Sequence, residues 1–138
     1  MSLHDCSLED LNYLAYDVAF TIGAEDTNAI TVNLQVNFGR NDNDGDALPI
    51  DHVAHLDWYL SDDSAGDGVV ATAPSGGVAG GTDGAVVPLV TGKAGFCTTE
   101  SDGDVDFVIT ETGADTFYLV IRLPNGRLAV SDAITFAT

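Results

Sequence analysis

Three short segments of the sequence place oxygen-bearing side chains close enough together to bind a hard cation. They are residues 41–46, 61–63 and 102–104. Calcium takes several oxygen ligands from flexible loops. The candidate metal ligands are therefore the carboxylates of Asp42, Asp44, Asp46, Asp102 and Asp104. Because the same residue types beside glycine also form ordinary turns, a metal-free loop is the competing interpretation. We expect no obligatory cofactor, with calcium as the alternative.

The first of these segments comes close to an EF-hand loop without being one. Asp42, Asp44 and Gly45 fit the third, fifth and sixth positions of such a loop. Arg40, however, stands at the first position, and Asp51 replaces the glutamate expected at the twelfth. The flanking residues show no helical periodicity. An EF-hand is therefore excluded, and any calcium site here would be of another kind, pooling ligands from two loops.

No arrangement of side chains in the sequence indicates catalysis. His52 and His55 lie three residues apart at the start of an expected strand, which places them on opposite faces, and His4 is far from both. Zinc-site spacing of Cys and His, a Gly-x-Ser-x-Gly turn and a lysine-bearing phosphate loop are all missing. We predict no catalytic residue and no enzymatic activity.

The charge of the chain restricts its partners. Four basic residues face 22 acidic ones among 138 residues, which gives a formal net charge of −18. Such a charge repels nucleic-acid phosphates and anionic lipids, so neither nucleic acid nor membrane is an expected partner. It also suits a salt-rich setting, where screening shortens the range of the electrostatic repulsion between copies of the protein. The first residues lack the features of a signal peptide, and no apolar run is long enough for a transmembrane helix.

Two cysteines are too few for a disulfide framework. Cys6 and Cys97 are far apart in the sequence. We expect two reduced thiols, with Cys97 buried in a strand as a small apolar residue, and a single disulfide is the alternative.

Alternating apolar and polar residues predict an all-β domain. The alternation runs through residues 16–22, 30–38, 54–60, 105–110 and 117–123. Counting the shorter stretches near residues 86–90, 93–99, 128–130 and 134–136 gives about seven to nine antiparallel strands, spaced as in a β-sandwich. Trp58 has the size and position of a central core residue. No fixed-period repeat is present.

Turn residues separate these strands. Residues 39–49 are polar and rich in turn formers, and residues 61–85 form a long loop or an edge of short bent strands. Pro88 restricts its strand to an edge or a bulge. Asn125-Gly126 suits a two-residue hairpin turn with positive φ.

The first 15 residues form a separate piece. Residues 1–15 are an N-terminal arm, and residues 16–138 are the sandwich domain. Leu8, Leu11 and Leu14 would share one face of a helical turn, with Tyr13 nearby. The arm either packs on its own domain or docks on a neighbouring subunit. Arg122, on the outward face of its strand, either pairs with an acid across the sheet or anchors an interface.

A longer stretch resembles a known family. Residues 57–136, about 80 of the 138 residues, resemble the Ig-like domains of tailed-bacteriophage structural proteins. The resembling pieces are Trp58-Tyr59-Leu60-Ser61-Asp62-Asp63, Gly66-Asp67-Gly68, Gly81-Thr82-Asp83-Gly84, Thr99-Glu100-Ser101-Asp102-Gly103-Asp104, Thr116-Phe117-Tyr118-Leu119-Val120, Leu123-Pro124-Asn125-Gly126-Arg127 and Val130-Ser131-Asp132-Ala133-Ile134-Thr135-Phe136-Ala137.

This resemblance implies an Ig-like antiparallel β-sandwich and a non-enzymatic virion structural protein. The first expectation is a capsid decoration, or cement, protein on the outer capsid surface, assembled in the host cytoplasm. Its partners would be the major capsid protein and neighbouring copies of itself, as a homo-oligomer on the virion. The partner-interface residues would be Leu8, Leu11, Tyr13, Leu14 and Arg122. The alternatives are an Ig-like tail tube or fibre component, or a glycan or host-surface-binding module that uses Tyr59 and Tyr118 as its aromatic platform.

Overall fold

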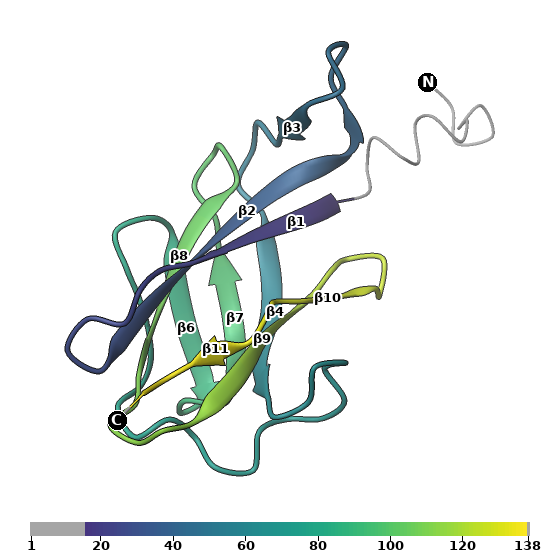
Figure 1. Cartoon of the computed structure of the whole chain (residues 1–138). Coiled ribbons are helices and arrows are strands. Elements are labelled where there is room, and N and C mark those ends of the chain that lie inside the picture. The colour runs from purple at the N-terminus through teal and green to yellow at the C-terminus, as the bar shows by residue number, and fades with distance from the viewer. Residues whose placement is uncertain (1–15, 138) are drawn as a thin grey trace.

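Residues 16–137, which the computed structural model describes, form two antiparallel β-sheets packed as a sandwich (Figure 1). The first sheet contains β1 (Tyr16–Ile22), β2 (Ala29–Asn41), β3 (Ala47–Pro49), β5 (Gly77–Gly80) and β8 (Asp104–Thr110). The second sheet contains β4 (His55–Ser61), β6 (Ala85–Val90), β7 (Ala94–Thr98), β9 (Thr116–Arg122), β10 (Leu128–Val130) and β11 (Ile134–Thr135). The expected all-β sandwich is confirmed.

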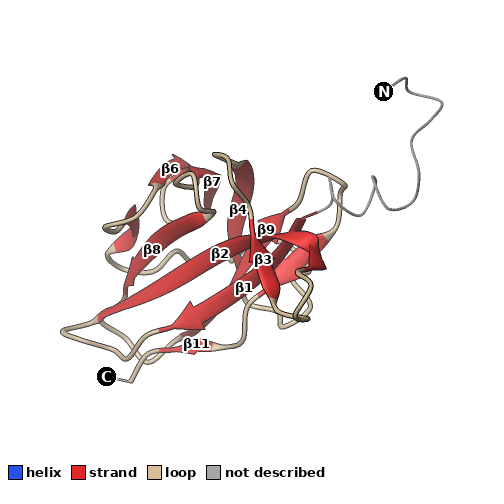
Figure 2. Ribbon diagram, turned by 90° about the horizontal axis from the view of Figure 1, so that it is seen from above, coloured by secondary structure: helices blue, strands red, loops and turns tan. Residues whose placement is uncertain are grey.

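The strand order is not the order of the sequence. The first sheet runs β1-β2-β8-β5, with β3 also paired to β2, and Figure 2 shows the long β2 between β1 and β8. The second sheet runs β10-β9-β4-β7-β6, with β11 also paired to β9. The turn after β8 therefore carries the chain from one sheet to the other and does not close a hairpin. Within residues 16–137 there is no helix long and apolar enough to cross a membrane.

The alternation seen in the sequence places the apolar residues in one shared core. Every second residue of β2 from Ile30 to Phe38 is buried, as are Leu56, Trp58 and Leu60 of β4. Trp58 is 1% exposed and packs edge-on against Phe107 of β8, with ring centroids 5.8 Å apart and an interplanar angle of 77°. The strands predicted from period-two patterns thus face inward as expected.

The described residues contain eleven strands, more than the seven to nine expected. The additional ones are short. The clearest is β3, because residues 39–49 form a hairpin rather than only a loop: β2 continues to Asn41, which pairs with Ala47. These residues are mostly exposed, so no apolar alternation marked them as strand.

The β9–β10 hairpin differs from the expected two-residue turn. Only Gly126 has positive φ, at 86°, and the turn begins one residue earlier, with the Gly126 N–H donating to the Leu123 carbonyl at 2.9 Å. Leu123 N–H in turn donates to the Arg127 carbonyl at 2.9 Å. Pro124 causes the shift, because its fixed φ suits the first central position of a type I turn. The result is a three-residue loop closed by a left-handed glycine.

Strand β6 lies at the edge of its sheet and has an irregular register, as its proline predicts. Pro88 lies within it, and its register with β7 shifts between Pro88 and Val90. Gly95 of β7 lies opposite Pro88, and a Cβ at this glycine would lie 2.0 Å from the Val87 carbonyl oxygen. Only glycine allows β6 and β7 to approach this closely.

We predict that Gly95→Ala destabilises the protein by at least about 2 kcal/mol, because the added methyl group forces backbone apart in a packed sheet. Gly80→Ala is the matched control in β5, where the nearest heavy atom to the added Cβ is 3.4 Å away. This control should change stability by no more than about 0.5 kcal/mol. Chemical denaturation measures both, and equal losses in the two variants would contradict the prediction.

Candidate functional site

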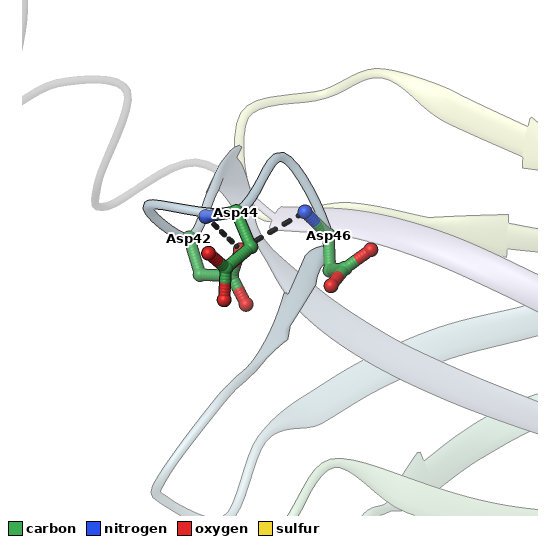
Figure 3. A group of neighbouring side chains, drawn as sticks. All are labelled: Asp42, Asp44 and Asp46. Carbon is green, nitrogen blue, oxygen red and sulfur yellow. Dashed lines mark hydrogen bonds between the residues drawn. The ribbon is translucent and has the colours of Figure 1, made fainter.

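The first group of candidate metal ligands is assembled at the tip of the β2–β3 hairpin. Asp42, Asp44 and Asp46 bring carboxylate oxygens within 4.8 Å of one another (Figure 3). Asp42 Oδ1 accepts hydrogen bonds from the backbone N–H groups of Asp44 and Asp46, both at 2.9 Å. Gly45 adopts a φ of 83°. The hairpin tip is therefore closed by the protein's own hydrogen bonds, with Asp42 half-buried and Asp44 and Asp46 exposed.

A second acidic group joins two loops. Asp83 precedes β6, Glu100 follows β7, and Asp104 begins β8; their carboxylate oxygens also lie within 4.8 Å of one another. The β6–β7 register, in which Ala85 pairs with Thr98, places the two loops side by side. Of the residues nominated from the third acidic loop, only Asp104 belongs to this group.

Asp102, the other residue nominated from that loop, lies outside both groups. It is exposed, and its backbone carbonyl accepts a hydrogen bond of 2.7 Å from the Gln35 amide. Gly103 separates it from Asp104 with a φ of 86°, which turns the chain between the two acids.

Crowding changes the protonation of the second group. The pKa of Asp83 rises from 3.8 to about 6, first because its carboxyl shares a hydrogen bond with Asp104, and then through burial and the charges of Asp104, Glu100 and Asp106. The Asn33 amide donates to the carboxylates of both Asp104 and Asp106. Asp104 therefore accepts hydrogen bonds from Asn33 and from the protonated carboxyl of Asp83, which keeps its proton up to about pH 6.

Glu111 is a buried acid with a structural role. Its carboxylate accepts backbone hydrogen bonds from Gly113 at 2.8 Å and Ser75 at 3.1 Å. These bonds, led by that of Gly113, lower the pKa of Glu111 below its usual value. The carboxylate thus holds the β8–β9 connection against the loop before β5.

The two histidines have different partners, but His52 precedes β4 instead of lying on one face of it as expected. His52 hydrogen-bonds through Nε2 to the Tyr16 hydroxyl at 2.6 Å, whereas His55 Nδ1 lies 3.1 Å from the Thr98 hydroxyl. The two imidazoles therefore belong to different local networks. His4 lies outside the described residues.

Arg122 lines a shallow cavity of about 310 Å³ on the outer face of the second sheet. The lining residues are His55, Leu56, Asp57, Arg122, Leu123 and Pro124. Asp57 is the register partner of Arg122. Within residues 16–137, however, no salt bridge joins Arg122 to Asp57. Arg122 is exposed here, so its guanidinium is accessible.

The tyrosines proposed as an aromatic platform are only partly exposed. The Tyr59 hydroxyl donates to the Gly66 carbonyl at 2.6 Å, and burial raises its pKa, with a further contribution from Asp67. Gly66 packs against Val120 and Val130, so the loop after β4 folds back over the outer face of β9. Tyr59 therefore fixes this loop, which reduces the surface that it can offer to a sugar.

Cys97 is buried in β7 as a free thiol, as expected. Burial, with the charge of Asp57, raises its pKa to about 12, so the thiolate is scarce at neutral pH.

Cys6 lies outside the described residues. So do the whole arm of residues 1–15 and its interface candidates Leu8, Leu11, Tyr13 and Leu14.

Sequence reasoning missed Asp83 and Glu100. Both lie in segments whose residues are typical of turns, and only the pairing of β6 with β7 brings them to Asp104.

Searches of family models, curated proteins and solved structures found nothing that matches this chain.

We predict that the contribution of Asp83 to stability falls as the pH rises from about 4 to about 6. Between the ordinary Asp value of 3.8 and the folded value of about 6, the folded chain binds more protons at Asp83 than the unfolded chain does. Asp83→Asn should remove this contribution and flatten the dependence in that window. Thermal denaturation across the pH range measures both proteins.

Asp102→Asn is the matched control, because Asp102 is an exposed acid of the same loop outside the group. It should keep the wild-type pH dependence. An Asp83→Asn protein with an unchanged slope would refute the raised pKa of Asp83.

Proposed function

We propose that this protein is a non-enzymatic structural protein of a tailed-phage virion, and specifically a decoration (cement) protein of the head. The observation that carries the proposal is the match between the resembling pieces and the folded elements. Residues 57–136 span β4 to β11, and the pieces fall on strands β4, β9 and β11 and on the turns between strands. A resemblance that follows real elements in order supports common architecture better than scattered turn residues would.

The strand order supports the Ig-like part of this proposal. Labelled in Ig fashion, β1-β2-β8-β5 corresponds to strands A-B-E-D, and β10-β9-β4 corresponds to G-F-C. Trp58 lies buried on β4, the strand in the C position, as the Ig core tryptophan does. The departure is that β6 and β7 follow β5 in sequence, so the strands added beside β4 come after the strand in the D position.

A decoration protein works through many weak contacts. Each copy contributes a small interface to the shell, and the array of copies clamps neighbouring capsid subunits against internal pressure. In this proposal the arm of residues 1–15, or one sheet edge, bridges subunits of the major capsid protein. The net charge of −18 keeps particles apart in solution.

We expect this chain to be near-stoichiometric with the major shell protein in gradient-purified particles. A decoration protein covers the whole shell, whereas a tail tube or fibre component is present in far fewer copies. Quantitative mass spectrometry of the particles measures the ratio. A low ratio would move the protein to the tail, and absence from the particles would overturn the virion proposal.

We also expect that deletion of residues 2–14 abolishes binding to shells that lack the protein, because it removes the apolar residues Leu8, Leu11, Tyr13 and Leu14. Co-sedimentation with such shells measures binding, and circular dichroism checks that the β fold is retained. Arg122→Ala in the full chain is the comparison, since it removes the other interface candidate. Normal binding by the truncated protein would reject the arm as the attachment.

A further inference from the structure

The outer surface of β6 and β7 is an apolar patch of four side chains, Val87, Leu89, Val90 and Phe96, here called the β6–β7 patch. Leu89 is 69% exposed and Phe96 is 41% exposed. Val87 and Phe96 are register partners on the two strands, and Leu89 and Val90 follow along β6. Single exposed apolar residues are normal on a soluble protein, but a group of neighbours indicates an interaction surface.

The local structure holds these side chains outward. Val86 turns inward to pack on the core, which leaves Val87 on the outer face. The register shift after Pro88 places Leu89 outside the regular pairing. Gly95 lets β6 lie directly against β7, so the patch rests on a close-packed pair of strands. Its side chains are therefore presented by a firm backbone, which lowers the entropy cost of binding.

Pro88 indicates that the contact is made by the face of the sheet. Proline has no N–H to donate, so a proline in an edge strand hinders the pairing of a further strand. An added strand would meet Pro88 and the adjacent register shift. The four apolar side chains face no such obstacle, so they are the binding elements.

Charge favours a second copy as the occupant. Residues 84–98 contain no acidic residue, although the chain has 22, and the only charged residue among them is Lys93. The acid that borders the patch is Asp57 of β4, the register partner of Phe96, and its partner on the other side is the basic Arg122. Two molecules that each carry −18 repel one another over most of their surfaces, and the repulsion is weakest where acids are missing. A basic partner would be drawn instead to the acidic loops around Asp42 and Asp83. The patch therefore fits a second copy of this chain.

We propose that the β6–β7 patch is the interface of a homodimer in which the same patch of each copy faces the other. This arrangement is the commonest symmetry of homo-oligomers, and it lets Leu89 and Phe96 of each copy supply the central apolar contacts. The proposal goes beyond the virion function and does not depend on it, because the dimer forms with the purified chain alone.

The test is sedimentation velocity of the full-length chain over a wide range of concentration, at low and at high salt. The wild type should dimerise, and salt should strengthen the dimer, because screening removes repulsion while the apolar contact remains. Leu89→Asp and Phe96→Asp should each weaken the dimer by at least about tenfold, since each places a charge in the apolar contact.

Leu128→Asp is the matched control. Leu128 is 47% exposed on β10, at the opposite edge of the same sheet, so this variant adds the same charge outside the patch. It should dimerise as the wild type does, and thermal denaturation confirms that every variant is folded. A wild-type chain that stays monomeric at high concentration and high salt overturns the proposal. So does a dimer that survives both patch substitutions, or one that salt dissociates.

Discussion

The contact that joins the two sheets at their centre is the edge-on packing of Trp58 against Phe107. Trp58 belongs to β4 and Phe107 to β8, which are interior strands of opposite sheets. Aromatic pairs in this geometry contribute about 0.5–1.5 kcal/mol beyond the burial of their area. The indole N–H also donates to the Phe96 carbonyl at 3.2 Å, so the one polar atom of the tryptophan is satisfied inside the sandwich. The same bond fixes the backbone of β7, whose Phe96 side chain is exposed on the other face.

Around this core, the carboxylates are stabilised by hydrogen bonds more than by cationic side chains. The Asn33 amide donates hydrogen bonds to the carboxylates of Asp104 and Asp106. Backbone N–H groups donate to the carboxylates of Asp42 and Glu111, and Asp83 shares a hydrogen bond with Asp104. Donors of this kind replace the hydration that a crowded carboxylate loses. A chain with four basic residues has few ion pairs to use, and this arrangement stabilises the acids without them.

The sequence predicted what is local and missed what depends on register. Period-two alternation identified β1, β2, β4, β8 and β9, because the side-chain direction of a strand is set by its own residues. The Asp83–Glu100–Asp104 group was not predictable in this way. It requires the pairing of Ala85 with Thr98, which no local pattern encodes. Asp102, two residues from Asp104 in sequence, was nominated and is absent from the group because the turn at Gly103 separates them. Proximity in sequence was a poor guide to ligand geometry at this loop.

The placement of charge distinguishes one edge of the sandwich from the rest. Acids lie on both sheets and their loops, including Asp17 and Asp106 of the first sheet and Asp57, Asp62 and Asp132 on or beside strands of the second, whereas strands β6 and β7 carry none. Solubility requires that molecules repel one another, and assembly requires that they meet. An acid-free edge serves both requirements, because repulsion between two copies is weakest there. A copy that approaches along β6 and β7 meets apolar surface, whereas other approaches bring acidic residues of the two molecules together.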